Sequence, residues 1–577
     1  MKKLLVYLSS YKKETVLAPL FKFLEAIFDL LVPLVVKQII DVGIANRDKP
    51  YIVAMCAILV GFAIVGLGCT LVAQYYAARA AVGFSTALRR DLFAHIQKFS
   101  YAQTDTVGTS TLITRMTSDI NQLQAAVNLT LRLFLRSPVI VLGAMIMAFT
   151  VDVRSALVFV VVIPLLSAVV FTIMIKSIPL FKRVQKNLDR VTGITRENLT
   201  GVRVIRAFRK EDEEIAAFNA ANDDHTGFQN FVGKISALMN PITLILVNGG
   251  VIVLLLSGAH FVEIGEMTQG EVVAMTNYMA QILVELVKFA NTLLTVNKAL
   301  ACGDRIEAVL EAPVGMAVQE GSSSSALDTQ TAVIFSNVGL TYEGNAEPSL
   351  TGIDLQVPRG ATVGIIGSTG SGKSSAVQLI PRFYDATEGA VLVNGRDVRT
   401  YTPEELRDRI AIVPQKPILF RGTVRSNLLW GNNNATDEEL WTALEAAQAK
   451  DFVLQKEGGL DAPVTQGGRN FSGGQRQRLT IARALVRKAE ILILDDSSSA
   501  LDYATDAALR KSLRELPERP TIFLISQRTS SIQHADVILV LEDGRSVGVG
   551  THEQLLHSCE VYREIYESQF QKGEDAE

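Results

Sequence analysis

The chain has 577 residues, too many for one ordinary domain, and 48% of them are hydrophobic, giving a mean hydropathy of +0.25 that is high for a water-soluble protein. This composition predicts a membrane protein. The net charge of −3 gives no reason to expect nucleic acid as a partner, and the four widely separated cysteines indicate neither a disulfide framework nor a metal cluster.

Six apolar segments in the first half of the chain are long enough to cross a bilayer, which takes about 20 residues. They lie at 16–40, 51–78, 126–150, 154–177, 236–262 and 268–297. The connections after the second and fourth segments are long, helical in period and rich in Lys and Arg, so the positive-inside rule predicts that they are cytoplasmic. We therefore expect residues 1–312 to form an all-α six-helix transmembrane domain with both chain termini in the cytoplasm.

The two long cytoplasmic segments should continue the membrane helices below the bilayer and then turn back. Each turn is a candidate contact point with a cytoplasmic domain, at 100–110 in the first segment and at 199–211 in the second. The alternative interpretation is that both segments are plain solvated connectors.

Ionisable side chains inside the spans should face protein or a water-filled cavity, because charge is costly to place in lipid. Asp29 and Glu285 are the candidate cavity residues, and acidic groups facing a cavity would favour cationic amphiphiles as substrates. Glu285 lies three residues before Lys288, so a self-neutralising structural pair on one helix face is at least as good an interpretation.

A linker is expected at 313–330, where Pro313 and a serine run at 321–325 interrupt the helical pattern. Over residues 331–566 short aliphatic strands alternate with helices, which predicts an α/β domain with a largely parallel sheet. The acidic residues at 567–577 predict a disordered tail.

A glycine-rich loop at 367–374 lies between an aliphatic strand and a helical run. Its glycines allow backbone N–H groups to surround a nucleotide phosphate at a helix N-terminus, where the helix dipole also favours negative charge. Lys373 would reach the β- and γ-phosphates, and Ser374 would bind Mg²⁺. The aliphatic strand 491–494 ends in Asp495, which can approach Mg²⁺ directly or through water. Together these features predict a P-loop NTPase domain that binds ATP and Mg²⁺.

A second motif at 471–475 opens another long helix with a Ser-Gly-Gly start, which again directs backbone donors and a helix dipole at a phosphate. One chain has no obvious need for two phosphate-binding loops. With this motif the chain resembles the ATP-binding cassette (ABC) transporter family, in which the signature contacts the γ-phosphate of ATP held by the opposite nucleotide-binding domain. The signature residues are Phe471, Ser472, Gly473, Gly474 and Gln475.

The resemblance implies roles for further residues. Gln415 would be the Q-loop residue, and Tyr342 the aromatic residue that stacks on adenine, although an isolated tyrosine more often packs in a core. Six spans followed by one cassette resemble a half-transporter of the exporter type, and 197–208 resembles the second coupling region of those exporters. The implied nucleotide-binding residues are Tyr342, Gly367, Ser368, Thr369, Gly370, Ser371, Gly372, Lys373, Ser374, Ser375 and Asp495, with Ser374, Gln415 and Asp495 at Mg²⁺ and Ser499, Ala500, Leu501 and Asp502 as the D-loop.

Two positions depart from the family pattern. The residue after Asp495 is normally a Glu that polarises the attacking water, but here it is Asp496, whose carboxylate is one methylene shorter. The family's switch His is here Gln527, which can donate a hydrogen bond but cannot carry an imidazolium charge. Misplacement of a catalytic group by ~1 Å can lower a rate ~10²-fold. The alternative is that Asp works adequately and that Gln is drift.

Both departures weaken the site built on this chain's own phosphate-binding loop, whereas the signature, which serves the other site, is intact. The chain therefore resembles the degenerate-site subunit of heterodimeric bacterial multidrug exporters. The resemblance implies an ATP- and Mg²⁺-dependent exporter of hydrophobic or amphipathic drugs or lipids in the bacterial cytoplasmic membrane, paired with a non-identical half-transporter that carries the usual Glu and His. The alternatives are a homodimeric lipid or peptide exporter, a soluble cassette ATPase, which the six spans oppose, and a membrane receptor that senses nucleotide.

Overall fold

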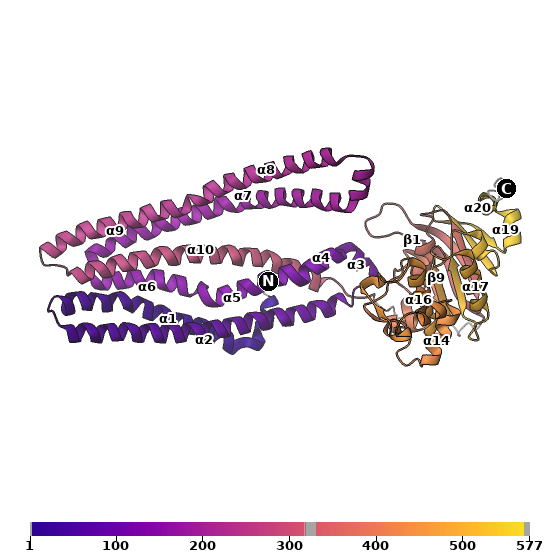
Figure 1. Ribbon diagram of the computed structural model, residues 1–577, viewed down its shortest axis with the longest axis horizontal. Coiled ribbons are helices and arrows are strands. Elements are labelled where there is room, and N and C mark those ends of the chain that lie inside the picture. Colours follow the sequence, from indigo (N-terminus) through magenta and orange to yellow (C-terminus); the bar gives the residue numbers. More distant parts are fainter. Residues whose placement is uncertain (1–2, 317, 319–329, 571–577) are drawn as a thin grey trace. The chain divides into compact units, whose positions relative to one another are not determined.

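The computed structural model describes residues 3–316, 318 and 330–570 (Figure 1). The chain divides into two compact units, one of Met1–Gln97 with Ser110–Ala312 and the other of Lys98–Thr109 with Pro313–Glu577. Most of the predicted linker, including its serine run, and residues 571–577 of the predicted tail lie outside the described residues. The first tail residues, 567–570, are the end of the helix α20 (Glu560–Phe570).

The described residues of the first unit form helices joined by short connections. Five helical stretches among the described residues are long and apolar enough to cross a membrane. They are α2 (Lys49–Ile96), the stretch Thr109–Val151 that ends in α6 (Arg136–Val151), α7 (Val153–Ala207), the stretch Glu211–Glu263 that joins α8 (Glu211–Ala237) to α9 (Met239–Glu263), and α10 (Gln269–Glu311).

The remaining predicted span, 16–40, falls on α1 (Lys12–Gln38) and the π-helical turn that follows it (Ile39–Ile44). This helix carries Lys22, Glu25, Asp29 and Lys37, so it is less apolar than the other five. It nevertheless packs along α2, α6 and α10 inside the unit. The unit is thus a helical bundle with five strongly apolar helices and a sixth that contains paired charges.

Side-chain caps define where the helices begin at the short connections. The Asp48 carboxylate accepts a hydrogen bond from the backbone N–H of Tyr51 at 3.1 Å, and the Asp152 carboxylate accepts one from Ser155 at 2.7 Å. At α10, Thr268 and Glu271 cap each other's backbone N–H groups. Such caps satisfy donors that have no partner within the helix.

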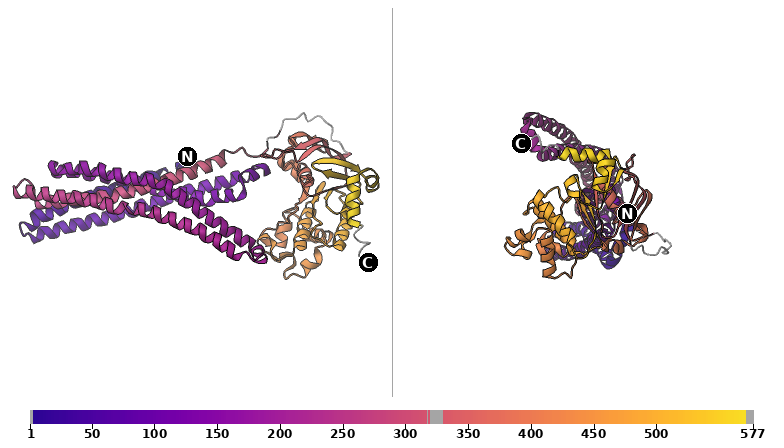
Figure 2. Two further views of the ribbon diagram at one scale, coloured as in Figure 1. Left: turned by 90° about the horizontal axis from the view of Figure 1, so that it is seen from above. Right: turned by 90° about the vertical axis from the view of Figure 1, so that its right-hand side faces the viewer.

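The predicted helical continuations of the second and fourth spans are present. α2 runs to Ile96, and α7 runs to Ala207 before the chain reverses at Arg209, whose φ is +52°. α7 then lies beside α8 and α9, forming a long hairpin (Figures 1 and 2). Near its tip Leu199 and Phe208 are each 73% exposed, and contact of this region with a cytoplasmic domain stays a prediction.

The second unit contains a six-stranded sheet in the order β12-β11-β3-β10-β9-β6, in which all neighbouring strands are parallel except β11 and β12. This agrees with the predicted α/β fold. Its strands are β3 (Thr362–Gly367), β6 (Ile410–Val413), β9 (Ile491–Asp495), β10 (Thr521–Ile525), β11 (Val537–Glu542) and β12 (Arg545–Gly550). An antiparallel sheet, β2-β1-β4-β5, consists of β1 (Thr331–Leu340), β2 (Leu350–Pro358), β4 (Glu388–Val393) and β5 (Arg396–Asp397).

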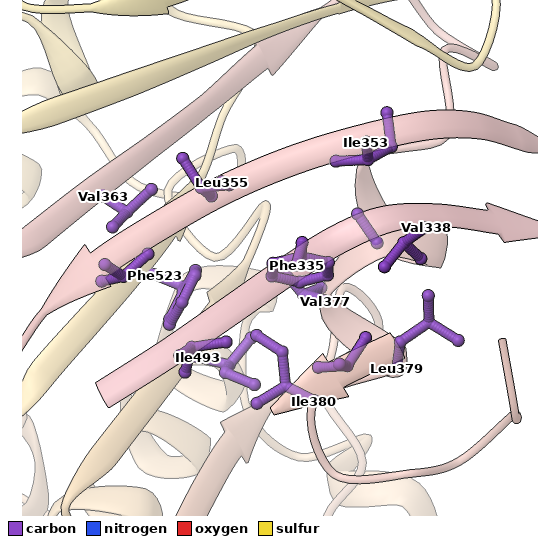
Figure 3. Packing of buried hydrophobic residues seen from close by; sticks show 14 of the residues in the cluster. Phe335, Val338, Ile353, Leu355, Val363, Val377, Leu379, Ile380, Ile493 and Phe523 are labelled. Carbon is purple, nitrogen blue, oxygen red and sulfur yellow. The ribbon is translucent and has the colours of Figure 1, made fainter. Parts of the chain in front are cut away.

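A hydrophobic core joins the two sheets around α11 (Lys373–Gln378). Figure 3 shows Phe335 of β1 beside Val377 of α11, with Phe523 of β10 in the same cluster. All five residues of β9 are buried, as expected for an aliphatic strand covered on both faces. The core therefore fixes the end of β9 and the start of α11, which hold the predicted phosphate-binding residues.

The helix α3 (Tyr101–Val107), in the first predicted contact region, belongs to the second unit. The Tyr101 ring stacks on the Phe383 ring with centroids 4.2 Å apart, and the Tyr384 hydroxyl donates a hydrogen bond to the Asp105 carboxylate at 2.6 Å. Burial and this bond both raise the pKa of Tyr384. The segment is therefore more than a solvated connector.

Candidate nucleotide-binding site

The candidate site lies at the carboxyl ends of three neighbouring parallel strands. Ile365 of β3 is in register with Ile525 of β10, and Ile525 is in register with Asp495 of β9. The glycine-rich loop follows β3, Asp496 follows β9, and Gln527 follows β10. Residues far apart in sequence thus meet at the edge where open α/β sheets bind ligands.

The glycine-rich loop needs glycine at its last position before α11. Gly372 has a φ of +91°, and a Cβ there would lie 2.8 Å from the Ser349 carbonyl oxygen. The Lys373 ammonium folds back over the loop and donates to the carbonyl oxygens of Gly367 at 2.9 Å and Ser368 at 2.5 Å. Burial lowers the pKa of Lys373, an effect that the carboxylates at 495 and 496 partly oppose. The Lys373 ammonium therefore places a positive charge at the loop that would bind a phosphate.

Asp495 and Ser374 form a pair of hard oxygen ligands. The Ser374 hydroxyl donates to the Asp495 carboxylate at 2.9 Å, and the aspartate side chain is buried. Burial raises the pKa of Asp495, the Ser374 hydrogen bond opposes this rise, and the neighbouring Asp496 adds to it. A carboxylate beside a hydroxyl is the oxygen donor set that suits Mg²⁺, and a cation there would relieve the repulsion between the two aspartates.

Asp496 has a left-handed backbone, with φ of +46°, and its N–H donates to the Ile525 carbonyl oxygen at 3.0 Å. Its carboxylate accepts a long hydrogen bond, 3.4 Å, from the side-chain amide of Gln415. Gln415 and Asp496, which lie 81 positions apart in the sequence, are therefore neighbours in the structure.

A cavity of about 730 Å³ gathers most of the predicted residues of this chain's own site. The predicted residues that line it are Thr369, Gly370, Gly372, Lys373, Ser374, Ser375, Gln415, Asp495, Asp496 and Gln527. Gly367, Ser368 and Ser371 belong to the same loop but are not among the lining residues. The cavity is thus large enough for a nucleotide. It is lined by the Lys373 cation, by Ser374 and Asp495 as candidate Mg²⁺ ligands, and by Asp496 and Gln527, the two residues that depart from the family pattern.

Sequence reasoning missed two other parts of the cavity wall, the stretch from Asn345 to Ser349 and the turn at Asp543 and Gly544. The Gly544 carbonyl oxygen accepts from the Thr351 N–H at 2.8 Å, which brings the two parts together. An Asp-Gly pair after an aliphatic strand is a recognisable hairpin signal. That signal predicts a turn, but not that the turn lies beside the phosphate-binding loop at the same edge of the sheet.

Tyr342 is placed beside the phosphate cavity rather than in its wall. Its hydroxyl donates to the Ser375 hydroxyl at 2.9 Å, and its ring meets the Tyr384 ring edge-on with centroids 5.0 Å apart. Burial raises the pKa of Tyr342. It lines a separate cavity of about 470 Å³ with residues of α3, including Asp105. Stacking of Tyr342 on adenine stays a prediction.

The signature residues are not among the described residues that line the 730 Å³ cavity. Ser472 instead caps the helix α16 (Gly473–Val486): its hydroxyl oxygen accepts from the Gln475 backbone N–H at 3.3 Å, and its own N–H donates to the Gln475 side chain at 3.0 Å. A Cβ on Gly474 would lie 2.9 Å from the Ala500 carbonyl oxygen, so the D-loop packs closely on the signature. The Ser499 hydroxyl donates to the Asp496 carbonyl oxygen at 2.9 Å, which ties the D-loop to the chain's own site.

Comparisons with known proteins agree with this arrangement. Residues 15–286 match the family model of the ABC transporter transmembrane region, and residues 350–499 match that of the ABC transporter. An uncharacterised ABC transporter ATP-binding protein of Mycobacterium tuberculosis is 37% identical over 566 residues, covering 98% of this chain and 97% of its own. The chain belongs to the ABC transporter family. It is an exporter-type half-transporter, with a transmembrane region fused to one ATP-binding cassette.

Two more relatives of this ABC transporter have names that refer to cargo. A putative multidrug export ATP-binding/permease protein of Bacillus subtilis is 30% identical, covering 98% of both chains. An ATP-dependent lipid A-core flippase of Chromohalobacter salexigens is 32% identical, covering 99% of this chain and 98% of its own. A bacterial Atm1-family ABC exporter with ATP bound has the same fold, with a TM-score of 0.80 at 22% identity over 97% of this chain and 98% of that one.

The two acids predicted to face a transport cavity take part in a charge cluster of the transporter's helical unit. The Arg136 guanidinium contacts the carboxylates of Glu285 at 2.5 Å, Asp29 at 2.8 Å and Glu25 at 3.5 Å. Glu285 also accepts from Lys288 at 3.0 Å, the pair expected from their spacing. The Glu285 side chain is 5% exposed and that of Asp29 is 43% exposed. Glu285 thus has structural partners, and Asp29 is the more accessible acid.

Proposed function

We propose that this chain is one subunit of a heterodimeric ABC exporter that moves hydrophobic or amphipathic small molecules out across the bacterial cytoplasmic membrane. In this proposal its own ATP site is degenerate and hydrolyses slowly, while its signature completes a competent site on a non-identical partner. The observation that carries the proposal is that Asp496 and Gln527, the two departures from the family pattern, line the same cavity as Lys373 and Ser374.

ATP binding would first rearrange Lys373, whose two bonds to loop carbonyl oxygens must be exchanged for bonds to phosphate. Ser374 and Asp495 would hold Mg²⁺, which neutralises charge on the β- and γ-phosphates. The Gln527 amide would donate one hydrogen bond toward the γ-phosphate without adding positive charge. Nucleotide would therefore be held firmly in this site.

Hydrolysis needs a carboxylate close to the attacking water. The Asp496 side chain is one methylene shorter than the usual Glu, and its backbone is fixed by the bond to Ile525. Because the backbone cannot approach to compensate, water activation should fall on the order of 10²-fold. The partner's site would use Ser472 and Gly473 of this chain to close on its γ-phosphate and would carry most of the turnover.

A multidrug cargo is supported by the likeness to the Bacillus subtilis export protein. A homodimeric lipid exporter is the second candidate, supported by the likeness to the lipid A-core flippase. In a homodimer both sites would contain Asp496 and Gln527, and brisk ATP hydrolysis by the chain alone would be required. Purified chain that hydrolyses ATP at a rate typical of an exporter, with inhibition by vanadate, would favour this second candidate.

The main test uses a pair reconstituted from this chain and a non-identical half-transporter that carries the usual Glu and His. The partner's Glu→Gln change at the position corresponding to Asp496 should reduce ATP turnover and transport about 10²-fold. Asp496→Asn in this chain should leave at least half of both activities. Equal loss from the two single changes would contradict the asymmetric model.

A further inference from the structure

The carboxyl-terminal helix α20 contacts the segment that contains Gln527 through one side chain. The Gln569 side-chain oxygen accepts hydrogen bonds from the backbone N–H and the hydroxyl of Thr529, both at 2.9 Å. The Gln569 side-chain NH₂ donates to the backbone carbonyl oxygen of Gln527 at 2.7 Å. A single amide therefore binds the chain on both sides of Arg528.

Besides Gln569, the segment is attached by bonds near the end of β10 and by the Arg528 side chain, which donates to the Leu501 carbonyl oxygen at 3.5 Å and lies over the Tyr503 ring. The Ser526 N–H donates to the Ile365 carbonyl oxygen at 3.1 Å, and the Arg528 N–H donates to the Ser526 hydroxyl at 3.0 Å. These bonds fix where the segment leaves β10. The bonds from Gln569 fix where it enters α18 (Thr529–Ile532).

α20 is held firmly enough to act as an anchor. Tyr562 of this helix is completely buried, in a cluster that includes Ile366 of β3 and Ile532 of α18. Its hydroxyl also lies 2.7 Å from a ring nitrogen of His552. Because Tyr562 fixes the helix against Ile366, the residue that precedes the phosphate-binding loop, Gln569 connects the Gln527 segment to a cluster that adjoins this loop.

We propose that Gln569 is a positioning residue of the ATP site, which sets where the Gln527 side chain stands relative to the γ-phosphate. The inference rests on the proposed role of Gln527. An amide suits this task because it offers an acceptor to Thr529 and a donor to the Gln527 carbonyl oxygen at once. A carboxylate at 569 would keep the acceptor but lose the donor.

The test measures affinity for ADP and for a non-hydrolysable ATP analogue on the purified full-length chain in nanodiscs. Gln569→Ala and Gln569→Glu should each weaken binding of the analogue about fivefold and leave ADP affinity within about twofold, because ADP does not reach Gln527. Ser568→Ala, next to Gln569 on the same helix, is the matched control and should change neither affinity. Thermal unfolding reports whether each variant is folded, and faster hydrogen exchange of the Thr529 amide in Gln569→Ala reports that its bond to residue 569 is broken.

A second comparison separates this inference from the role given to Gln527. Gln527→Ala should weaken binding of the analogue selectively, and adding Gln569→Ala should then have no further effect, since the two changes act through one group. If Gln527→Ala is selective and both Gln569 variants are silent, Gln569 is not a positioning residue. If the Gln569 variants weaken ADP and the analogue equally, the residue serves general stability and the proposal is wrong. If Gln527→Ala weakens binding of ADP and of the analogue equally, the proposed role of Gln527 is wrong. All of these measurements use the purified chain, so their outcomes do not depend on which partner the chain has.

Discussion

Restoring the usual residues should make this chain an active ATPase without a partner. We expect the double substitution Asp496→Glu and Gln527→His to raise ATP hydrolysis by the purified chain about 10²-fold. The added methylene advances the carboxylate by about 1.5 Å from a backbone that is fixed at Ile525, and the imidazole supplies a group able to carry positive charge next to the γ-phosphate.

The structure allows this change at a modest energetic cost. A non-glycine residue with φ of +46° is strained, and Asp tolerates this conformation better than Glu, so the substitution should destabilise the segment by about 1 kcal/mol. A 10²-fold rate gain corresponds to about 2.7 kcal/mol of transition-state stabilisation. The strain is present in the ground state and in the transition state alike, so it lowers the stability of the fold without reducing the rate gain. The substitution also displaces the Asp496 carboxylate from the 3.4 Å hydrogen bond that Gln415 donates to it, which is too long to contribute much.

The assay is steady-state phosphate release at saturating Mg-ATP in nanodiscs. Asp496→Asn with Gln527→His is the matched control and should show no gain, because an amide cannot accept a proton from water. Two results would refute the reasoning. One is an unmodified chain that already turns over at several per second, within the range typical of enzymes. The other is a double variant that binds ATP with normal affinity yet remains slow.

Three further predictions concern other parts of the chain. Arg136→Ala should lower the free energy of unfolding in detergent by about 1–3 kcal/mol, because it removes the cation that Glu285, Asp29 and Glu25 share and leaves Glu285 with Lys288 as its remaining cationic partner, and adding Glu285→Gln should recover part of the loss. Tyr384→Phe removes the hydrogen bond to Asp105 while keeping the ring, so substrate-stimulated ATPase activity of the active dimer should fall about two- to fivefold with unchanged ATP affinity. Burial raises the pKa of Asp495, so the folded chain binds this proton more readily than the unfolded chain, and stability decreases as pH rises from the ordinary pKa of an aspartate to the raised one. Asp495→Asn should therefore raise the melting temperature of nucleotide-free protein at neutral pH, by roughly 2–4 °C for each kcal/mol of buried-charge penalty that the substitution removes. It should also abolish stabilisation by Mg-ATP.

Much of the cassette was predictable because its chemistry depends on local sequence. Three of its segments each place a functional group next to a backbone conformation that the local sequence predicts. They are the loop between β3 and α11, the aliphatic strand that ends in Asp495 and the capped helix after Ser472. Parallel strands then bring their carboxyl ends together, so residues 128 positions apart, Gly367 and Asp495, reach one site by a general rule of the fold.

The interactions that sequence reasoning missed depend on long-range packing without a local signature. The Asp543–Gly544 turn has the pattern of an ordinary hairpin, and Gln569 has that of a polar residue near the end of the chain. The sequence predicts a span at 16–40 and a cavity role for Asp29, but it gives no sign that Arg136 from another helix contacts this carboxylate. Such contacts between distant residues can be identified only when the positions of both side chains in space are known.

The signature and the chain's own ATP site are physically connected within one polypeptide. Gly474 packs against Ala500, and Ser499, one residue earlier, donates its hydroxyl to the Asp496 carbonyl oxygen. In the proposed heterodimer, closure of the signature on the partner's ATP would therefore act on the residue that limits hydrolysis here. On this proposal, a site that retains nucleotide but cleaves it slowly would still supply a rigid surface against which that closure can act, and Lys373, Ser374 and Asp495 would serve transport without rapid hydrolysis at this site. Ser499→Ala should consequently slow turnover at the partner's site more than it changes ATP affinity at this one, and an equal effect on both would show that the D-loop serves each site separately.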